Sequence, residues 1–326
     1  MEKRPFGATG FDTTPIAFGA MRIKKNASGI SEAMLYALEK GINFIDTARN
    51  YGESESIVRR TLKEWNGERP FIASKVQPLD ITNWRFPVPL EVQFTPKSIT
   101  ESVETSLKML DVDCIDLIQM HQWYYLWGLR PEWLDTLKRL QKEGKVRFIG
   151  VSALDHEHDA VLKIIDDKVV DAVQIAMNAF ESRPFTSVTP LSKMRNVAVI
   201  GRCIFDHSAS LARGGNRDVL ANDIKLSKGS PEIVTEYINR IDQLVSECCT
   251  DLMPLNELSV RFALSDPGVS NIALSMGSRS SVDSAIAFAK KGPLEADLVE
   301  KIKTEHIWVK NFNYFSKATQ DGKIKN

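Results

Sequence analysis

Short runs of apolar residues recur along the chain and alternate with longer stretches in which apolar and polar residues mix. The runs have the length of strands, and several of them are rich in Ile and Val. Near-continuous apolar runs are typical of strands that are buried on both faces. We therefore predict eight strands, at residues 15–21, 43–48, 70–76, 114–121, 146–152, 171–178, 197–203 and 270–277.

Several of the intervening stretches have the spacing of amphipathic helices. The pattern predicts helices at residues 31–41, 95–110, 131–145, 231–248 and 254–265 and again after residue 293. Gly41 suits the end of the first helix, because glycine readily adopts the left-handed conformation found there. Thr95 and Pro96 suit the N-cap and the first position of the second helix.

Eight strands, most of them followed by a helix, predict an α/β protein, a (β/α)8 (TIM) barrel. A doubly wound sheet also alternates strands and helices, but a G-x-G-x-x-G turn normally follows its first strand. Here the sequence RIKKNASG follows instead. The segment RPFGATGFDTTPI, residues 4–16, predicts a hairpin before the barrel.

No internal repeat, low-complexity tract or interdomain linker is evident. We therefore expect residues 1–326 to form a single barrel domain with an extra C-terminal helix and a tail. The active-site loops are expected at about residues 77–95, 122–130 and 204–230, and the tail at 309–326.

Charge and cysteine content narrow the function classes. Lys plus Arg number 42, as do Asp plus Glu, so no net field favours nucleic acid or a membrane surface. The four cysteines form no C-x-x-C pair, which argues against a zinc site or a redox dithiol. The first ten residues lack the apolar stretch of a signal peptide, and no run approaches a membrane span of about 20 apolar residues. We expect a cytoplasmic protein that uses no metal.

Polar residues stand at the ends of the predicted strands, where barrel enzymes place their active sites. Asp46 ends the second apolar run, Tyr51 follows it, Lys75 lies near the end of the third and His121 closes the fourth. An ammonium group lowers the pKa of a nearby tyrosine, so Lys75 could activate Tyr51 while Asp46 holds Lys75. A neutral His121 could orient a carbonyl oxygen toward the Tyr51 hydroxyl, which completes a general-acid assembly for carbonyl reduction.

Each of these residues also has an ordinary structural explanation. Asp46 could cap a helix, Tyr51 could pack at the barrel rim, Lys75 could be solvated, and His121 could be a hydrogen-bonded structural residue. Four residues of matching chemistry at the same end of consecutive strands argue against coincidence.

At these residues the sequence resembles the aldo-keto reductase family. The motifs that carry the resemblance run in the family order: GINFIDTARNYGESE, FIASKV, IDLIQMHQW, GKVRFIGVS, VDAVQIAMN and LSVRFALSDPGVSNIALSMGSR. The resemblance covers most of residues 5–290. It implies a (β/α)8 barrel that binds an extended nicotinamide cofactor, and a catalytic tetrad of Asp46, Tyr51, Lys75 and His121 with Tyr51 as general acid and base.

The resemblance also implies cofactor contacts. Ser152 and Gln174 match residues that hold the nicotinamide carboxamide, and Met21 matches a residue beside the nicotinamide. Arg202 occupies a seventh-strand position where an aromatic residue often stacks on the ring. The turn that meets the 2′-phosphate of NADP matches Gly277, Ser278 and Arg279, although a simple strand-to-helix turn would also explain Gly277 and Ser278.

The sequence departs from the family pattern in several places. Ala153 replaces an asparagine after Ser152, and residues 204–215 replace the loop that normally covers the pyrophosphate. Asp283 stands where a neutral residue is common, and its carboxylate would repel a 2′-phosphate. Arg279 argues for that phosphate, so NADP is favoured over NAD.

Aromatic residues gather in the loops that follow the third and fourth strands. Aromatic faces at a barrel mouth suit sugar rings or flat apolar substrates. Trp84 and Trp123 are the predicted substrate contacts, whereas Trp133 is expected to pack within the structure.

The leading interpretation is an NAD(P)H-dependent reductase of an aldehyde or ketone, with a sugar or a secondary metabolite among the candidate substrates. One alternative is an enzyme that uses bound nicotinamide transiently for epimerisation or elimination. A second alternative is a cofactor-sensing regulatory subunit. Net consumption of reduced cofactor with a carbonyl substrate separates the first interpretation from the other two.

Overall fold

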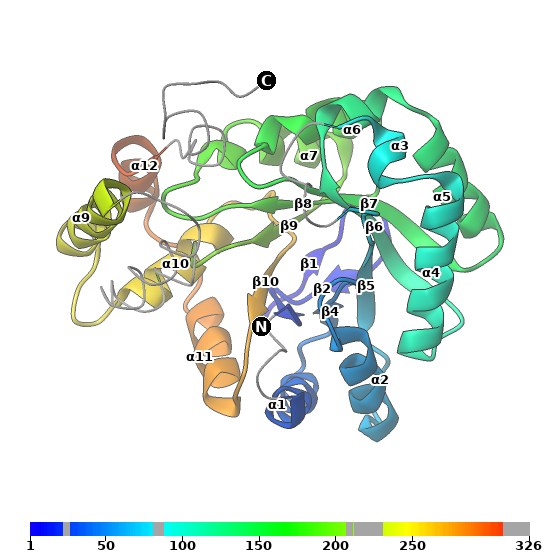
Figure 1. Ribbon diagram of the computed structural model, residues 1–326. Coiled ribbons are helices and arrows are strands. Elements are labelled where there is room, and N and C mark those ends of the chain that lie inside the picture. The colour runs from blue at the N-terminus through cyan, green and yellow to red at the C-terminus, as the bar shows by residue number, and fades with distance from the viewer. Residues whose placement is uncertain (22–26, 81–87, 207–210, 212–230, 309–326) are drawn as a thin grey trace.

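Eight parallel strands close into a barrel in the order β10-β3-β4-β5-β6-β7-β8-β9 (Figure 1). The computed structural model describes residues 1–21, 27–80, 88–206, 211 and 231–308. The barrel strands are β3 (Ile16–Gly19), β4 (Phe44–Asp46), β5 (Phe71–Val76), β6 (Ile115–Trp123), β7 (Val146–Ala153), β8 (Ala172–Ala176), β9 (Ala198–Arg202) and β10 (Asn271–Ser275). Each strand coincides with one predicted apolar run, so the predicted (β/α)8 fold is confirmed.

Helices surround the barrel (Figure 1). They are α1 (Ala27–Glu39), α2 (Ser54–Glu64), α3 (Leu90–Gln93), α4 (Pro96–Leu110), α5 (Glu132–Lys142), α6 (Leu162–Asp166), α7 (Val188–Arg195), α9 (Pro231–Cys248), α10 (Leu255–Leu264), α11 (Arg279–Lys290) and α12 (Ala296–Glu305), with short 3₁₀ helices η2 (Tyr125–Leu129), η3 (His158–Val161) and η4 (Arg183–Phe185). Thr95 caps α4 through a reciprocal hydrogen-bond pair with Ser98, and Gly41 follows α1 with a φ of +88°, as predicted. Of the helices that the structure describes, none combines the length and the apolar character needed to cross a bilayer.

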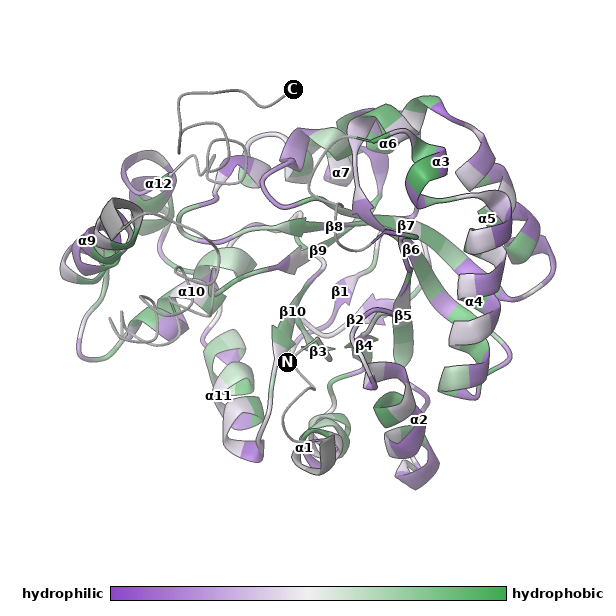
Figure 2. Cartoon of the chain, viewed as in Figure 1, coloured by the Kyte–Doolittle hydropathy of each residue, from purple (hydrophilic) through white to green (hydrophobic). Residues whose placement is uncertain are grey.

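Alternate residues of each strand face the inside of the barrel, and the residues between them face the helices. Phe44, Phe71 and Leu117 belong to the interior cluster, whereas Ile45 and Ile72 pack in the larger core under the helices. In Figure 2 the strands are largely hydrophobic, while the helices carry hydrophilic residues on their outer sides. Burial on both faces explains why the strands read as continuous apolar runs.

The predicted hairpin is present ahead of the barrel. β1 (Arg4–Pro5) pairs antiparallel with β2 (Asp12–Thr13). Gly7 lies in the connecting turn with a φ of +55°, and a Cβ atom at this position would come 2.7 Å from the backbone nitrogen of Ala198. Only glycine fits this turn, because a side chain would be both strained and in collision with β9.

Aromatic rings fill the amino-terminal end of the barrel. The Phe6 ring lies 5.2 Å from that of Phe44 and 5.3 Å from that of Phe71, and the Phe44 and Phe71 rings stack at 4.9 Å between centroids. Phe44 and Phe71 are the first residues of β4 and β5. The hairpin residue Phe6 therefore helps to close this end, and polar side chains are left to the opposite end.

Strand β6 runs past its predicted end and contains an irregularity. Its register with β7 shifts between Met120 and Trp123, and Gln122 adopts a φ of +59°. Of the expected loops, residues 81–87, 207–210 and 212–230 lie outside the described residues, as does the tail 309–326.

Removing one ring from the interior aromatic cluster should cost far more stability than removing an exposed apolar side chain. We expect Phe44→Ala to lower the free energy of unfolding by about 3–5 kcal/mol, because it leaves a cavity in a closed interior. Phe44→Leu, which keeps more of the volume, should lose less. Leu252→Ala is the control, since Leu252 is 87% exposed. Urea unfolding curves measure all three, and comparable losses for Phe44→Ala and Leu252→Ala would contradict this packing.

Candidate active site

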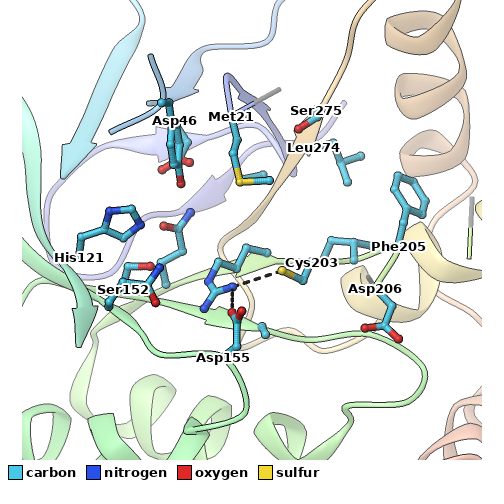
Figure 3. Close-up of a pocket in the computed structure, with 18 of the residues that line it drawn as sticks. Met21, Asp46, His121, Ser152, Asp155, Cys203, Phe205, Asp206, Leu274 and Ser275 are labelled. Carbon is cyan, nitrogen blue, oxygen red and sulfur yellow. Dashed lines mark hydrogen bonds and ion pairs between the residues drawn. The ribbon is translucent and has the colours of Figure 1, made fainter. Parts of the chain in front are cut away.

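A pocket of about 440 Å³ opens at the carboxyl ends of the barrel strands. Ligand sites of small-molecule enzymes have volumes of this order. Figure 3 shows Asp46 and His121 on one side of this pocket and Phe205 and Asp206 on the other. The residues around it come from seven strands and the loops that follow them: Gly19, Met21, Asp46, Asn50, Tyr51, His121, Gln122, Ser152, Asp155, His156, Gln174, Ala176, Glu181, Arg202, Cys203, Ile204, Phe205, Asp206, Ala273, Leu274 and Ser275. The part of the chain that the structure describes contains no group of three or more His, Cys, Asp or Glu side chains suited to a metal ion.

Barrel closure brings the four residues singled out at the strand ends together. The Nζ atom of Lys75 donates to Oδ1 of Asp46 at 2.7 Å and to the backbone oxygen of Thr47 at 2.9 Å. The same nitrogen lies 4.9 Å from the centre of the Tyr51 ring. The His121 ring meets the Tyr51 ring edge-on, with 5.8 Å between centroids. Asp46, Tyr51 and His121 line the pocket, and the Lys75 ammonium is buried beside them.

The loop that carries Tyr51 is held in place by a buried carboxylate that sequence reasoning missed. Glu55, in the first turn of α2, accepts a hydrogen bond from the Ser74 hydroxyl at 2.7 Å and pairs with Arg49 at 3.0 Å. Ser74 is the immediate neighbour of Lys75 on β5. Glu55 thus connects the start of α2, the Tyr51 loop and β5, and only its position within the GESE motif could have signalled this.

Burial and charge shift the pKa values of the clustered groups in different directions. Burial disfavours the charged form of Lys75, but Asp46 and Tyr51 outweigh it and raise its pKa above the ordinary value. Burial also raises the pKa of Tyr51, and it prevails over the opposing charges of Lys75 and Arg202. Lys75 therefore lowers the pKa of Tyr51, as expected. The expectation that the pKa of Tyr51 is lowered overall was wrong, because burial raises it by more.

His121 is held neutral, as expected. Its burial, followed by the positive charges of Lys75 and Arg202, lowers its pKa well below the ordinary value, and Asp155 opposes this only in part. A neutral imidazole can donate one hydrogen bond and accept another. Its Nδ1 atom has no hydrogen-bond partner among the described residues.

Arg202 contributes a second positive charge to the pocket, at the end of β9. Its Nη1 atom lies 2.5 Å from Oδ1 of Asp155 and 3.2 Å from the Cys203 sulfur (Figure 3, dashed lines). Its Nη2 atom donates to the backbone oxygen of Ala153 at 2.7 Å. Although burial works against the charge, Asp155 raises the pKa of Arg202 further. Sequence reasoning missed Asp155, because nothing in the sequence marks it as the partner of a residue 47 positions away.

All four residues matched to nicotinamide contacts, Arg202 among them, line the same pocket. Ser152 and Gln174 are neighbours in the register of β7 and β8, and both are buried. The Oε1 atom of Gln174 is buried without a hydrogen-bond partner in the described structure. A primary carboxamide could donate to this oxygen, so the residues present fit a nicotinamide. Met21, which is 48% exposed, lies at the pocket wall formed by β3.

The residues matched to the 2′-phosphate turn lie apart from the pocket lining. Ser278 caps α11, and a Cβ atom at Gly277 would meet nothing within 4 Å. Arg279 pairs with Glu32 of α1 at 3.0 Å and lies over the Tyr36 ring. Asp283 accepts a hydrogen bond from the Tyr36 hydroxyl at 3.0 Å. Both charges at this helix start therefore have partners on α1 that the sequence did not reveal.

Trp123, one of the two tryptophans predicted to contact substrate, does not line the pocket. Trp84 lies outside the described residues. Trp123 is fully buried, its indole nitrogen donates to the Ala160 backbone oxygen at 3.1 Å, and its ring packs against Trp133 at 4.8 Å. The irregularity in β6 turns Trp123 into the core, so packing replaces its expected role. Trp133 is buried, as predicted.

A closed parallel barrel with a pocket at the carboxyl ends of its strands, lined by both polar and apolar residues, has the architecture of a barrel enzyme. Within that class, the chain belongs to the aldo/keto reductase family, whose model matches residues 15–305. Members of this family are oxidoreductases that use nicotinamide cofactors and generally act on carbonyl compounds.

Individual relatives and a solved structure agree with this assignment. The chain is 29% identical over 294 residues to aldo-keto reductase YhdN of Bacillus subtilis, and the match covers 84% of each protein. It is 30% identical over 203 residues to probable aldo-keto reductase 1 of Glycine max, a match that covers 60% of this chain and 56% of that protein. The holo form of aldo-keto reductase AKR11C1 from Bacillus halodurans superposes with a TM-score of 0.74 at 23% identity, covering 95% of this chain and 97% of that one. This likeness shows the shared fold.

The lowered pKa of His121 should couple protein stability to pH. Unfolding restores a pKa of about 6.5, so below that pH the unfolded chain binds a proton that the folded chain excludes. Stability contributed by neutral His121 is therefore full above about pH 6.5 and is lost as the pH falls toward the folded pKa. Burial is the main cause of the lowered His121 pKa, and the charged groups that add to it or oppose it are Lys75, Arg202 and Asp155.

We expect wild type to lose about 1.4 kcal/mol more unfolding free energy than His121→Asn between pH 7.5 and 5.5. Urea unfolding of both proteins at the two pH values measures the difference. All other titrating groups are common to both proteins and cancel in the comparison. An equal loss in the two proteins would show that His121 titrates in the folded state much as it does in the unfolded chain.

Proposed function

We propose that this protein reduces an aldehyde or ketone to an alcohol with a reduced nicotinamide cofactor, and that Tyr51 is its general acid. In the reverse direction Tyr51 would act as the base. The observation that carries the proposal is the buried Lys75 ammonium, placed between the Asp46 carboxylate and the Tyr51 ring at the pocket wall. The epimerisation and cofactor-sensing alternatives have no observation in their favour beyond this same cluster.

Tyr51 is protonated at neutral pH and can therefore serve as the proton donor, although burial raises its pKa and makes the hydroxyl a weaker acid. Proton transfer to the substrate oxygen would leave a phenolate beside two cations, Lys75 and Arg202. Both cations lower the pKa of Tyr51 and therefore stabilise this phenolate as it forms. Asp46 holds the Lys75 ammonium in place and keeps it charged.

His121 would orient the substrate carbonyl toward the Tyr51 hydroxyl. It is neutral, lies edge-on to the Tyr51 ring and has an unpartnered ring nitrogen. A neutral imidazole can donate a hydrogen bond to the carbonyl oxygen without competing with Tyr51 for the proton transfer.

Ser152, Gln174, Met21 and Arg202 would hold the nicotinamide. When bound, the reduced cofactor supplies the hydride that the substrate carbon accepts. The unpartnered Oε1 of Gln174 supports this role, because a carboxamide N–H gives it a partner.

At the far end of the cofactor, a modest preference for NADP over NAD is proposed. Arg279 stands at the start of α11, where the backbone N–H groups and the helix dipole favour a phosphate. Its pair with Glu32 is more than half exposed on both sides and therefore weak, so a 2′-phosphate can displace Glu32. Asp283 already accepts from Tyr36, but its charge still opposes the phosphate.

Tyr51→Phe should lower turnover by about 10²-fold or more, the scale of general acid–base catalysis. The substitution removes one hydroxyl and leaves the ring, so cofactor binding and folding should be nearly unchanged. Steady-state oxidation of NADPH with a panel of carbonyl compounds measures turnover. Tyr124→Phe is the control, because Tyr124 packs near Trp127 and is not part of the pocket lining. Near-normal turnover of Tyr51→Phe would rule out the proton-transfer role.

Arg279→Ala should weaken NADPH binding by about tenfold or more and leave NADH binding almost unchanged, since a charge-assisted hydrogen bond contributes about 1.5–3 kcal/mol. Glu32→Gln is the matched variant at the other end of the ion pair. It should bind NADPH at least as tightly as wild type, because a competing carboxylate is gone. Titration of both cofactors by quenching of protein fluorescence measures all these affinities. If Arg279→Ala lost equal affinity for NADPH and NADH, the turn at Gly277 would not bind the 2′-phosphate.

A further inference from the structure

Helices α1 and α11 pack side by side on the outside of the barrel (Figure 1). They meet because β10, which α11 follows, pairs with β3, which precedes α1. Glu32 and Tyr36, one turn apart on α1, face Arg279 and Asp283, one turn apart on α11. The start of α11, where the 2′-phosphate of NADP is proposed to bind, therefore has side chains of α1 as its neighbours.

Tyr36 contacts both charged residues on this face of α11. Its hydroxyl donates to the two carboxylate oxygens of Asp283, at 3.0 Å to Oδ1 and 3.2 Å to Oδ2. The guanidinium carbon of Arg279 lies 4.9 Å from the centre of the Tyr36 ring, a distance at which an aromatic face attracts a cation. One side chain of α1 thus holds the anion and the cation of the turn.

The position of the Tyr36 ring is set by contacts within the protein. The ring is half-buried and packs against the hydrophobic core. Lys40, one turn later on α1, places its Nζ atom 5.0 Å from the ring centre. The hydroxyl is therefore directed at Asp283 by contacts that do not involve a cofactor.

Asp283 is the group at this turn that would distinguish the two cofactors in favour of NAD. A carboxylate repels a 2′-phosphate, whereas it accepts a hydrogen bond from the free 2′-hydroxyl of the NAD ribose. Both carboxylate oxygens already accept from Tyr36. Tyr36 thus supplies the hydroxyl that the ribose of NAD would otherwise supply, and it holds the carboxylate toward α1.

We infer that Tyr36 determines cofactor specificity: its hydroxyl engages Asp283, so that the chain prefers NADP although an acidic residue stands at the cofactor turn. Tyr36 is a positioning residue, because it acts through Asp283. This inference rests on the proposed function and identifies the contact on which cofactor choice at the same site depends.

Tyr36→Phe tests the inference, because it removes the hydroxyl and keeps the ring beside Arg279. The variant should bind NADPH about threefold or more weakly and NADH about threefold or more tightly, so the ratio of the two affinities should change about tenfold. The changes are modest because Arg279 and Asp283 are exposed and solvent screens their charges. Titration of each cofactor by quenching of protein fluorescence measures these affinities.

Asp283→Asn distinguishes this role from a purely structural one. Added to Tyr36→Phe, it should restore NADPH affinity to within about twofold of wild type, because an amide carries no charge. Added to wild type, it should raise NADPH affinity by less, and the difference is the coupling that a double-mutant cycle measures. Tyr124→Phe is the control for the loss of a tyrosine hydroxyl. Tyr124 directly follows β6, away from α11, so both affinities should stay unchanged.

The outcomes separate this inference from the function on which it rests. Suppose that Arg279→Ala lowers NADPH affinity selectively, but Tyr36→Phe weakens both cofactors equally, changes neither, or is not restored by Asp283→Asn. The inference is then overturned and the proposed preference for NADP stands. An equal loss would show that the hydroxyl only supports the packing of α1 on α11. If wild type binds neither cofactor, or binds NADPH no more tightly than NADH, the proposed preference fails and the inference fails with it.

Discussion

The buried ion pair between Lys75 and Asp46 is the constraint on which the rest of the pocket depends. Lys75 is 1% exposed, and an ammonium group at such a position is strongly unfavourable unless it is paired and fully hydrogen-bonded. Asp46, the Thr47 backbone oxygen and the Tyr51 ring meet this requirement together. The end of β4, the Tyr51 loop and β5 are thus held in one arrangement, which the buried Glu55 carboxylate reinforces from α2.

Once that cation is in place, it sets the protonation state of its neighbours. Lys75 and Arg202 together help to keep His121 neutral, and both favour the phenolate of Tyr51 against the effect of burial. Arg202 is in turn held by Asp155 and by the Ala153 backbone oxygen at the end of β7. The two positive charges of the pocket, Lys75 on β5 and Arg202 on β9, therefore come from opposite sides of the barrel. The closed sheet fixes the distance between them.

Polar residues line the pocket on all sides, and the order of the strands in the barrel decides which of them lie beside the tetrad. Strands β4 and β6 bring the proton-transfer candidates and their amide neighbours to one side, whereas β8, β9, β10 and β3 supply most of the apolar lining. The left-handed backbone at Gln122 accompanies a change of direction, since Gln122 lines the pocket and the next residue, Trp123, is buried in the core. Backbone strain of this kind persists only where the surrounding packing supports it. Trp133 and the other rings around Trp123 provide that support.

The sequence by itself determined the barrel, because strands buried on both faces must be apolar at successive positions and all eight such runs became barrel strands. It also determined which polar residues stand at the strand ends, since Asp46, Tyr51 and His121 are marked by their place just after an apolar run. The partners of charged groups were decided by tertiary structure alone: Asp155 for Arg202, Glu32 for Arg279 and Glu55 for the Tyr51 loop. Tertiary structure also decided the positions of Gln122 and Trp123. An irregularity in β6 places Gln122 at the pocket and Trp123 in the core. Apolar periodicity is a local property of the chain, whereas ion pairs and bulges depend on the distance between strands that only the closed barrel sets.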